Sequence, residues 1–228
     1  MNIFITGTDT DVGKTYITIS LALAFKELGK KVGIFKPLQS GAIHRGDETL
    51  APDLEEAKKY SSDIKLKYSY LLDGEVSPSL AAKKAGITIN PDKIKSDFEE
   101  FKKDLDIVLV EGAGGLYCPA TNKQLMADII KLLDIPAIIV ARPNLGTVNH
   151  TLMTIECAKQ KGINILGVII NRYPTKTEDD AIINVKSQIE DFTDVKVIAT
   201  VYESNSKQDL KELIQKCLTE LNSCKELV

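Results

Sequence analysis

The chain has little of several features that mark particular functional classes. It contains no tryptophan, two histidines and four cysteines, and no two cysteines form a C-x-x-C pair. This pattern indicates neither a zinc knuckle nor a disulfide framework, so we expect reduced thiols. With 29 Lys plus Arg against 32 Asp plus Glu, the net charge is −3, which gives no overall basic surface for a nucleic-acid partner.

Signals for secretion and for membrane insertion are also missing from the sequence. The N-terminus begins with an apolar segment typical of a strand and lacks the basic n-region of a signal peptide. No apolar run approaches the length of a membrane span. We therefore expect a soluble, cytoplasmic protein with no membrane partner.

What the chain does have is the composition and the pattern of an α/β protein. Hydrophobic residues make up 43% and charged residues 27% of its 228 residues, an ordinary balance for a globular chain. Short, apolar, β-branched runs alternate with amphipathic stretches, which predicts a doubly wound, mainly parallel sheet with helices on both faces. The predicted strands are residues 2–6, 31–35, 106–110, 137–141, 165–170 and 196–201.

The organisation along the chain predicts a single domain over residues 1–228, because no repeat and no Pro/Gly/Ser-rich linker divides it. The stretch 37–103 has less strand character than the rest, and we interpret it as a helical insertion. It contains a loop and three helical patterns, at about 41–47, 53–60, 79–85 and 91–103. A further helical period covers residues 210–221.

A phosphate-binding loop is indicated between the first strand and the first helix. Residues 7–15 read G-T-D-T-D-V-G-K-T, which resembles a Walker A loop, although the leading glycine is Gly7 where the strict pattern has glycine at position 8. The loop amides would surround a β-phosphate, Lys14 would reach the β- and γ-phosphates, and the Thr15 hydroxyl would ligate Mg²⁺. The predicted fold is therefore of the P-loop NTPase type.

Two further strand ends carry residues that suit a nucleotide. Lys36 follows the second predicted strand and would supply another fixed positive charge for a transferring phosphoryl group. Residues 107–115 have the form of a Walker B strand, with Glu111 where aspartate is usual. Mg²⁺ needs only a hard carboxylate at this place, so glutamate can serve.

Four sequence blocks together resemble the dethiobiotin synthetase family. The blocks are residues 6–15, Lys36-Pro37 with Ser40-Gly41, residues 110–115, and L-G-T-V-N-H at 145–150. They occur in the order of the family and span most of the chain. Cobyrinate amide synthases share the first and third blocks loosely, so the narrower resemblance depends on the second and fourth.

This resemblance implies a homodimeric enzyme that depends on Mg²⁺ and uses ATP as a co-substrate. Such an enzyme uses CO₂ to close a cyclic urea on the vicinal diamine 7,8-diaminononanoate (diaminopelargonic acid), through a carbamate and a carbamic-phosphoric anhydride. Its products are dethiobiotin, ADP and phosphate. The reaction needs no side-chain nucleophile, which agrees with the lack of a convincing Ser-His-Asp or Cys-His set in the sequence.

The resemblance also implies a role for each matching residue. The catalytic residues would be Lys36, Lys14 and Thr10, and the Mg²⁺ ligands would be Thr15, Asp53 and Glu111. Substrate contacts would come from Thr10, Lys36 and Ser40 and, through helix amides of the neighbouring subunit that bind the substrate's carboxylate, from Gly146, Thr147, Val148 and Asn149. Nucleotide contacts, with Asn171 on the adenine, would come from Asp11, Val12, Gly13, Lys14, Thr15, Tyr16, Asp53, Glu111, Gly112, Ala113, Gly114, Asn171 and Arg172.

Some of these assignments have alternatives. Asp53 is also a suitable helix N-cap, in which case Asp47 would replace it as a ligand. Asn171 is also a typical turn residue at a strand end. Asp9 and Asp11 would offset the positive charge of the diamine. Two departures from the family's pattern are Asp11, where glutamate is frequent, and residues 201–205, which lack the proline that is usual near the adenine.

Other functions remain as alternatives. A cobyrinate-type amide synthase usually carries a glutaminase domain, for which 228 residues leave no room. An ATP-driven switch ATPase normally has an extra lysine at the position of Asp9. A GTPase would need an N-K-x-D motif to read the base, and this chain offers none.

Overall fold

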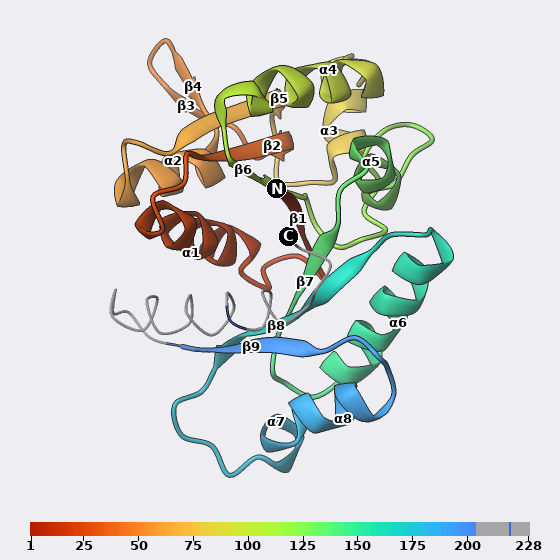
Figure 1. The fold of residues 1–228 in the computed structure, drawn as a ribbon. Helices are drawn as coiled ribbons and strands as arrows, with labels where there is room; N and C mark the ends of the chain where they lie inside the picture. The colour runs from red at the N-terminus through yellow and green to blue at the C-terminus, as the bar shows by residue number, and fades with distance from the viewer. Residues whose placement is uncertain (204–218, 220–228) are drawn as a thin grey trace.

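The structure is a computed structural model that describes residues 1–203 and Thr219 (Figure 1). The helical period expected over 210–221 lies outside the described residues apart from Thr219. Among the helices that the structure describes, none is long and apolar enough to cross a membrane.

A seven-stranded parallel sheet forms the centre of the fold, in the order β5-β2-β6-β1-β7-β8-β9. All six strands that the sequence predicts are present, so the expected α/β class with a parallel sheet is confirmed. Their bounds are β1 Asn2–Gly7, β2 Val32–Ser40, β6 Ile107–Glu111, β7 Ala137–Ala141, β8 Ile165–Tyr173 and β9 Val197–Tyr202.

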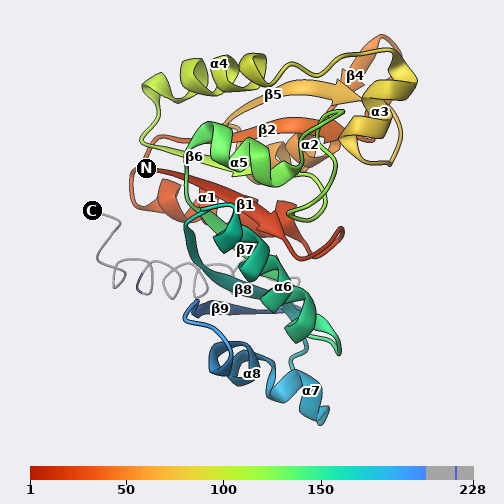
Figure 2. The same cartoon turned by 90° about the vertical axis from the view of Figure 1, so that its right-hand side faces the viewer.

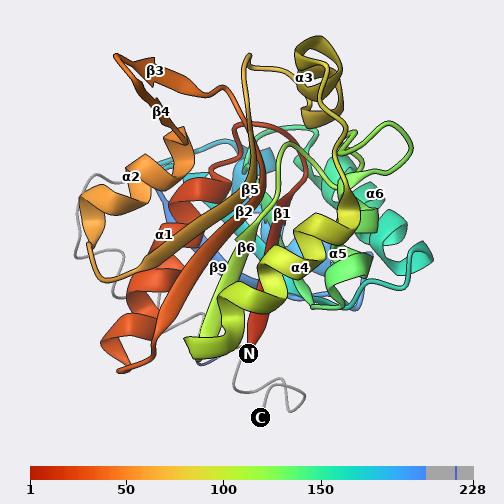
Figure 3. The ribbon, with the colours of Figure 1, turned by 90° about the horizontal axis from the view of Figure 1, so that it is seen from above.

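Helices cover both faces of the sheet, as Figure 3 shows from above. On β1, Ile3 and Ile5 pack in one core cluster with α1 (Lys14–Glu27) and α2 (Pro52–Tyr60), whereas Phe4 faces the opposite side. The helices on that side are α3 (Pro78–Ala85), α4 (Pro91–Phe101) and α5 (Met126–Leu133). The alternation of side chains along each strand therefore fills two cores with one sheet.

The end of the sheet at β9 carries its own group of helices (Figure 2). Ile155 of α6 (Thr147–Gln160) and Val185 of α8 (Val185–Asp191) pack against inward residues of β7 and β8. The short helix α7 (Asp180–Ile183) precedes α8.

The stretch 37–103 contains the three predicted helices but also strands that the sequence does not predict. Strand β5 (Lys65–Leu72) pairs in parallel with β2 at the edge of the sheet, from Gly33↔Lys65 to Ser40↔Leu72. A hairpin of β3 (Ile43–Arg45) and β4 (Glu48–Leu50) occupies the expected loop, and a 3₁₀ turn at Lys102–Asp104 follows α4. Strand β5 alternates lysine with apolar residues, and only Leu72 in it is fully buried. An edge strand of this kind lacks the continuous apolar run of an inner parallel strand.

The strand ends that matter for function all lie on the side of the sheet where the strands end, its carboxyl-terminal side. Because the strands are parallel, the carboxyl ends of β1, β2, β6 and β8 meet there, where loops and helix N-termini converge. The phosphate loop, Glu111 and Asn171 lie on this side. Lys36 lies within β2 rather than after it, because β2 continues to Ser40 along its pairing with β5.

Candidate active site

The phosphate loop is a tight turn between β1 and α1. Asp11 has φ 57° and Gly13 has φ 90°, so two residues of the loop adopt the left-handed conformation. Such a sequence of backbone angles directs amide groups into a concave nest that suits an anion. At Gly7, a Cβ would lie 2.8 Å from Val12 Cγ2. The close approach of the chain therefore requires glycine at position 7, one residue earlier than the strict pattern has it.

Asn171 supports this loop from β8. Its side chain is 2% exposed, and its Nδ2 donates to the Val12 carbonyl oxygen at 2.9 Å. A Cβ at Gly13 would lie 2.1 Å from Asn171 Nδ2, so these two residues fit together only because position 13 has no side chain. The contact with adenine that the resemblance implies for Asn171 stays a prediction.

Lys14 lies at the start of α1 with little exposure to solvent. The side chain donates from Nζ to the Asp9 carbonyl oxygen at 3.0 Å and is 7% exposed. Burial, together with the nearby charge of Lys36, lowers the pKa of Lys14 to about 8. A negatively charged ligand beside Lys14 would raise this pKa and stabilise the protonated lysine.

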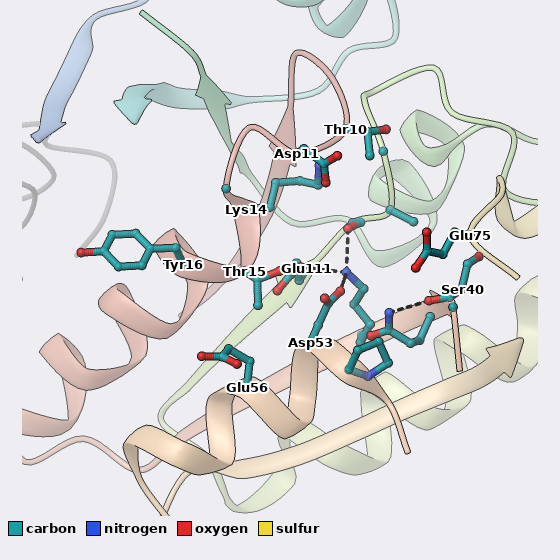
Figure 4. Close-up of a pocket in the computed structure, with 18 of the residues that line it drawn as sticks. Thr10, Asp11, Lys14, Thr15, Tyr16, Ser40, Asp53, Glu56, Glu75 and Glu111 are labelled. Carbon is teal, nitrogen blue, oxygen red and sulfur yellow. Dashed lines mark hydrogen bonds and ion pairs between the residues drawn. The ribbon is translucent and has the colours of Figure 1, made fainter. Parts of the chain in front are cut away.

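Lys36 is the centre of a buried charge cluster with Asp53 and Glu111, the two carboxylates that Figure 4 labels next to Thr15. Its Nζ is 2.7 Å from Glu111 Oε1, is paired with the Asp53 carboxylate and donates to the Gly112 carbonyl oxygen at 3.1 Å. Burial opposes the charge of Lys36, but the two carboxylates outweigh it and raise the pKa of the lysine. Burial raises the pKa of Glu111. Burial acts in the same direction on Asp53, but its ion pair with Lys36 holds the pKa of that carboxyl below the usual value.

The residues expected around Mg²⁺ come together at this cluster. The Thr15 hydroxyl donates to Glu111 Oε1 at 2.8 Å, and the Asp53 carboxylate reaches the same lysine as Glu111. In the described part of the chain, no group of three or more His, Cys, Asp or Glu side chains is placed to hold a metal ion. Mg²⁺ usually takes one or two carboxylates and completes its shell with phosphate oxygens and water, so two carboxylates and a hydroxyl around one cation fit it.

Asp53 is not the N-cap of α2. The N-cap position is Ala51, and no side chain there accepts a hydrogen bond. Asp53 lies in the first turn of the helix and pairs with Lys36 instead. Asp47, the alternative ligand, is exposed in the β3–β4 turn and does not line the cavity beside the phosphate loop.

A cavity of about 940 Å³ lies beside the loop and the cluster. Most of the residues expected from the sequence line it, namely Thr10, Asp11, Gly13, Lys14, Thr15, Tyr16, Lys36, Ser40, Asp53, Glu111, Gly112, Ala113, Gly114 and Arg172. Val12 and Asn171 do not line it; both are buried, and they are joined by the hydrogen bond described above. The cavity also has lining residues that the sequence analysis did not select, among them Gln39, Glu56, Glu75 and Cys118.

The two aspartates of the phosphate loop have different surroundings. Asp9 accepts from the Thr10 amide at 2.7 Å and from Arg142 Nη2 at 3.0 Å, and it does not line the cavity. Asp11 lines the cavity, and its charge favours the protonated form of Lys14. Of the two, only Asp11 is placed to face a cationic substrate in this cavity.

The residues expected to bind the substrate's carboxylate lie elsewhere. Gly146, with φ 89°, is the N-cap of α6. Residues 146–149 line a separate hollow of about 440 Å³ between α6 and the α7–α8 segment. Within one chain, the structure therefore does not bring them to the phosphate loop.

Comparisons with known proteins agree with this geometry. A family model described as "AAA domain" matches residues 1–208. A protein of Methanococcus vannielii named ATP-dependent dethiobiotin synthetase BioD is 38% identical over 213 residues, which cover 91% of this chain and 94% of that relative. A protein of the same name from Anoxybacillus flavithermus is 41% identical over 201 residues, or 87% of this chain and 90% of the relative.

Solved structures show a likeness of fold. The cell division ATPase MinD of Pyrococcus furiosus aligns with a TM-score of 0.64 at 19% identity, and the alignment covers 98% of this chain and 99% of that one. At this level of identity the likeness concerns architecture alone. It confirms the expected doubly wound sheet of the P-loop NTPase type.

Proposed function

The chain belongs to the ATP-dependent dethiobiotin synthetase family, and from this premise we propose that it closes a cyclic urea on 7,8-diaminononanoate. The other substrates are CO₂ and ATP, and the products are dethiobiotin, ADP and phosphate. The observation that carries the proposal is the position of Lys14 and Lys36 beside one cavity, together with Thr15, Asp53 and Glu111. This arrangement suits a reaction that gathers several anions.

We assign the nucleotide to the side of the cavity formed by the phosphate loop. The loop amides and Lys14 hold the terminal phosphates, and Thr15, Asp53 and Glu111 hold Mg²⁺. When bound, Mg²⁺ supplies positive charge beside the β- and γ-phosphate oxygens. We assign the base to the side of the cavity that Arg172 lines, next to Asn171, which also keeps the loop in place through its bond to Val12.

The reaction has three steps in which atoms and charge balance. One amine of the diamine adds to CO₂ and loses a proton, which gives a carbamate. A carbamate oxygen attacks the γ-phosphorus, and the bond from this phosphorus to the oxygen bridging it to the β-phosphorus breaks as ADP leaves. The second amine then attacks the carbonyl carbon of the mixed anhydride, loses its proton and expels phosphate as the ring closes.

The side chains contribute position and charge rather than a nucleophile. We assign the carbamate oxygen and the γ-phosphate to positions beside Lys36, whose ammonium would oppose their repulsion. Thr10 and Ser40 both line the cavity, and we assign them contacts with the diamine or its carbamate. Lys36 and Ser40 are part of β2, and Thr10 is part of the phosphate loop, so all three are positioned before any ligand binds.

The proposal includes a cytoplasmic homodimer whose partner completes each site. What supports the dimer is the distance in the fold between the α6 N-terminus and the phosphate cavity, since residues 146–149 line a different hollow. Helix amides at the start of α6 suit a carboxylate. In a dimer, those of one subunit would meet the carboxylate of a diamine bound to the other.

A single assay tests the proposed reaction. ADP release and dethiobiotin formation are measured with ATP and Mg²⁺, with the diamine or bicarbonate omitted in turn, and with EDTA. We expect ADP and dethiobiotin in equal amounts only when every component is present. ADP release that ignores the diamine would favour a switch ATPase, and ammonia-dependent amide formation would favour an amide synthase.

A variant of Lys36 refines this test. Lys36→Gln should lower kcat by about 100-fold or more, because it removes a charge that opposes the transition state's negative charge. The KM for ATP should change much less. Lys102→Gln, which removes a half-buried lysine that is paired with Glu99 and does not line the cavity, is the matched control. Equal losses in turnover and ATP binding would contradict the role given to Lys36.

A further inference from the structure

One end of the cavity is lined by hydrogen-bond acceptors rather than by lysines. Gln39 and Ser40 come from the end of β2, and Glu75 comes from the turn between β5 and α3. Figure 4 shows Glu75 beside Ser40, with its carboxylate toward the cavity. The Gly41 amide donates to the Gly74 carbonyl oxygen at 3.0 Å, which ties the Glu75 turn to the end of β2. We name Gln39, Ser40 and Glu75 the acceptor wall.

Two members of the acceptor wall have oxygens without a donor. Gln39 is 4% exposed, and its Nε2 donates to the Ser40 carbonyl oxygen at 2.9 Å. The same side chain lies near Asp53, where it helps to lower the pKa of that carboxyl. Because the Ser40 carbonyl oxygen and the Asp53 carboxylate are both acceptors, the amide nitrogen faces them and Oε1 is left without a donor. Gln39 Oε1 and Ser40 Oγ are buried and have no hydrogen-bond partner among the described residues.

Buried acceptors without donors are costly, and the Glu75 carboxylate at the same end of the cavity makes no ion pair with a described residue, so this end favours a ligand that brings N–H groups. The phosphates and the carbamate are themselves acceptors, so the Ser40 hydroxyl is the one group of this wall that can donate to them. An amine or an ammonium group supplies the missing donors. The acceptor wall therefore suits the nitrogen end of a substrate.

The charges around the cavity point to the same place. Asp53 and Glu111 are paired with Lys36, and Glu56 is paired with Lys59. Asp11 lies on the phosphate loop beside Lys14. Glu75 makes no ion pair within the described part of the chain and lies away from the phosphate loop, next to Ser40. Its negative charge is thus available to a cation in the cavity.

We propose that the acceptor wall recognises the amino groups of the substrate, with Glu75 as the ion-pair partner of the ammonium on the carbon that does not carry the carbamate. This inference rests on the proposed function, since it concerns the diamine of that same site. Glu75 and Gln39 are specificity-determining residues in this account. They separate a diamine from a substrate of similar length that has one amine.

The test uses Glu75→Gln in the full-length protein, with Asp73→Asn as the matched control. Asp73 lies two residues away, carries the same charge and pairs with His44 at the surface, outside the cavity. In Glu75→Gln, the KM for the diamine should rise by about 10- to 100-fold, the loss expected for a hydrogen bond to a charged group. The KM for ATP should stay constant, and Asp73→Asn should behave like the wild type.

Substrate analogues make the test specific for an amine. Two monoamines, each with one amino group replaced by hydrogen, are titrated into the wild type and Glu75→Gln by calorimetry. Glu75→Gln should raise the Kd of the analogue that keeps the amine facing Glu75. It should leave the Kd of the other analogue unchanged. A penalty that is the same for both analogues would overturn the assignment.

Failure of this inference is distinguishable from failure of the proposed function. If the wild type forms no dethiobiotin, the proposed function is wrong and the diamine has no place in the cavity. If the wild type is active but Glu75→Gln keeps its KM for the diamine, the function stands and the role of Glu75 is wrong. A parallel rise in the KM for ATP would also contradict it.

Discussion

At the scale of single residues, the cluster around Lys36 explains how this site tolerates buried charge. Three ionised groups away from water cost much free energy unless they pair closely. Lys36 meets that condition with Asp53, Glu111 and the Gly112 carbonyl oxygen. Removal of one partner from a buried pair costs about 3–5 kcal/mol. Lys36→Gln therefore reports on catalysis only when its folding is measured alongside its kinetics.

Lys14 makes the binding of ATP depend on pH. With a pKa of about 8 in the free protein, Lys14 loses its proton above pH 8, whereas bound phosphates raise its pKa and favour the charged form. Binding then takes up a proton, so affinity falls as pH rises. We expect the Kd for ATP to be about 20-fold higher at pH 9.5 than at pH 7.5, as measured by calorimetry.

Lys14→Gln is the control for this pH dependence. The variant should bind ATP weakly at both pH values, and its Kd for ATP should be the same at pH 7.5 and pH 9.5. Calorimetry in two buffers of different ionisation enthalpy should show uptake of nearly one proton per ATP at pH 9.5 in the wild type. An affinity that stays flat from pH 7.5 to 9.5 would mean that Lys14 keeps its proton in the free protein.

Which of these residues the sequence reveals depends on how local their signal is. Lys14 and Thr15 stand in a continuous motif, and Lys36 and Glu111 follow or lie in apolar strands, so their types and spacing suffice. Glu75 has no such signal, because it reaches the cavity only through the placement of β5. Gln39 follows Lys36-Pro37 in sequence, but its unpaired oxygen becomes apparent only when its neighbours are known.

At the scale of elements, the phosphate loop and β8 form one unit. Asn171 holds the Val12 carbonyl and fills the space that a side chain at Gly13 would need. The loop can therefore keep its conformation before the nucleotide binds. A motif predicted from residues 7–15 alone contains no sign of this support, because Asn171 lies far away in the sequence.

A substitution at Gly13 tests this unit. Gly13→Ala adds strain at φ 90° and brings a Cβ to 2.1 Å from Asn171 Nδ2, so it should abolish measurable ATP binding and lower the free energy of unfolding by about 1–3 kcal/mol or more. Asn171→Ala removes the clash but also the support. Urea denaturation of both single variants and the double variant measures their coupling.

The double variant should be less destabilised than the sum of the two single variants, by about 1 kcal/mol, because the clash exists only when both side chains are present. Gly29→Ala, just after the end of α1, is the control for backbone strain alone, since its φ is 75° and no atom of the described residues lies within 4 Å of a Cβ there. Strict additivity of Gly13→Ala and Asn171→Ala would show that the two side chains do not meet.

Strand β5 illustrates why the edge of the sheet escapes prediction. The inner strands are buried on both faces and read as continuous apolar runs, a pattern that is visible in the sequence. In β5 the burial is partial along most of its length, and lysines alternate with apolar residues. Such a pattern fits a solvated helix or a loop about as well. The consequence is functional, because β5 carries the turn that holds Glu75.

At the scale of the whole molecule, one architecture serves two kinds of chemistry. The fold is similar to that of MinD from Pyrococcus furiosus, whereas the sequence is similar to dethiobiotin synthetases. At the position where switch ATPases of this architecture normally carry an extra lysine, this chain has Asp9, which pairs with Arg142 on the same chain. Function therefore follows the residues at the sheet edge and not the sheet.

The start of α6 raises the question of how many chains make one site. Leu145, which precedes the helix N-cap, is 88% exposed, and Phe192 on the other side of the same hollow is 75% exposed. An apolar surface beside a helix N-terminus suits contact with another protein surface. If that surface belongs to a second copy, the helix amides of one subunit meet the substrate held by the other.

Mixed dimers test this arrangement. Lys14→Gln should inactivate the phosphate side of a site, and Asn149→Pro should inactivate the carboxylate side, because proline in the first turn of α6 has no backbone N–H to donate. After subunit exchange between equal amounts of the two variants, about half of the dimers are mixed, and each has one intact site out of two, so about a quarter of wild-type activity should return. Exchange is verified with differently tagged chains. A mixture of Lys14→Gln with Lys36→Gln is the control that should stay inactive. Both residues belong to the phosphate side, so every site in a mixed dimer carries one of the two changes. Complete exchange without recovery would place the whole site within one chain.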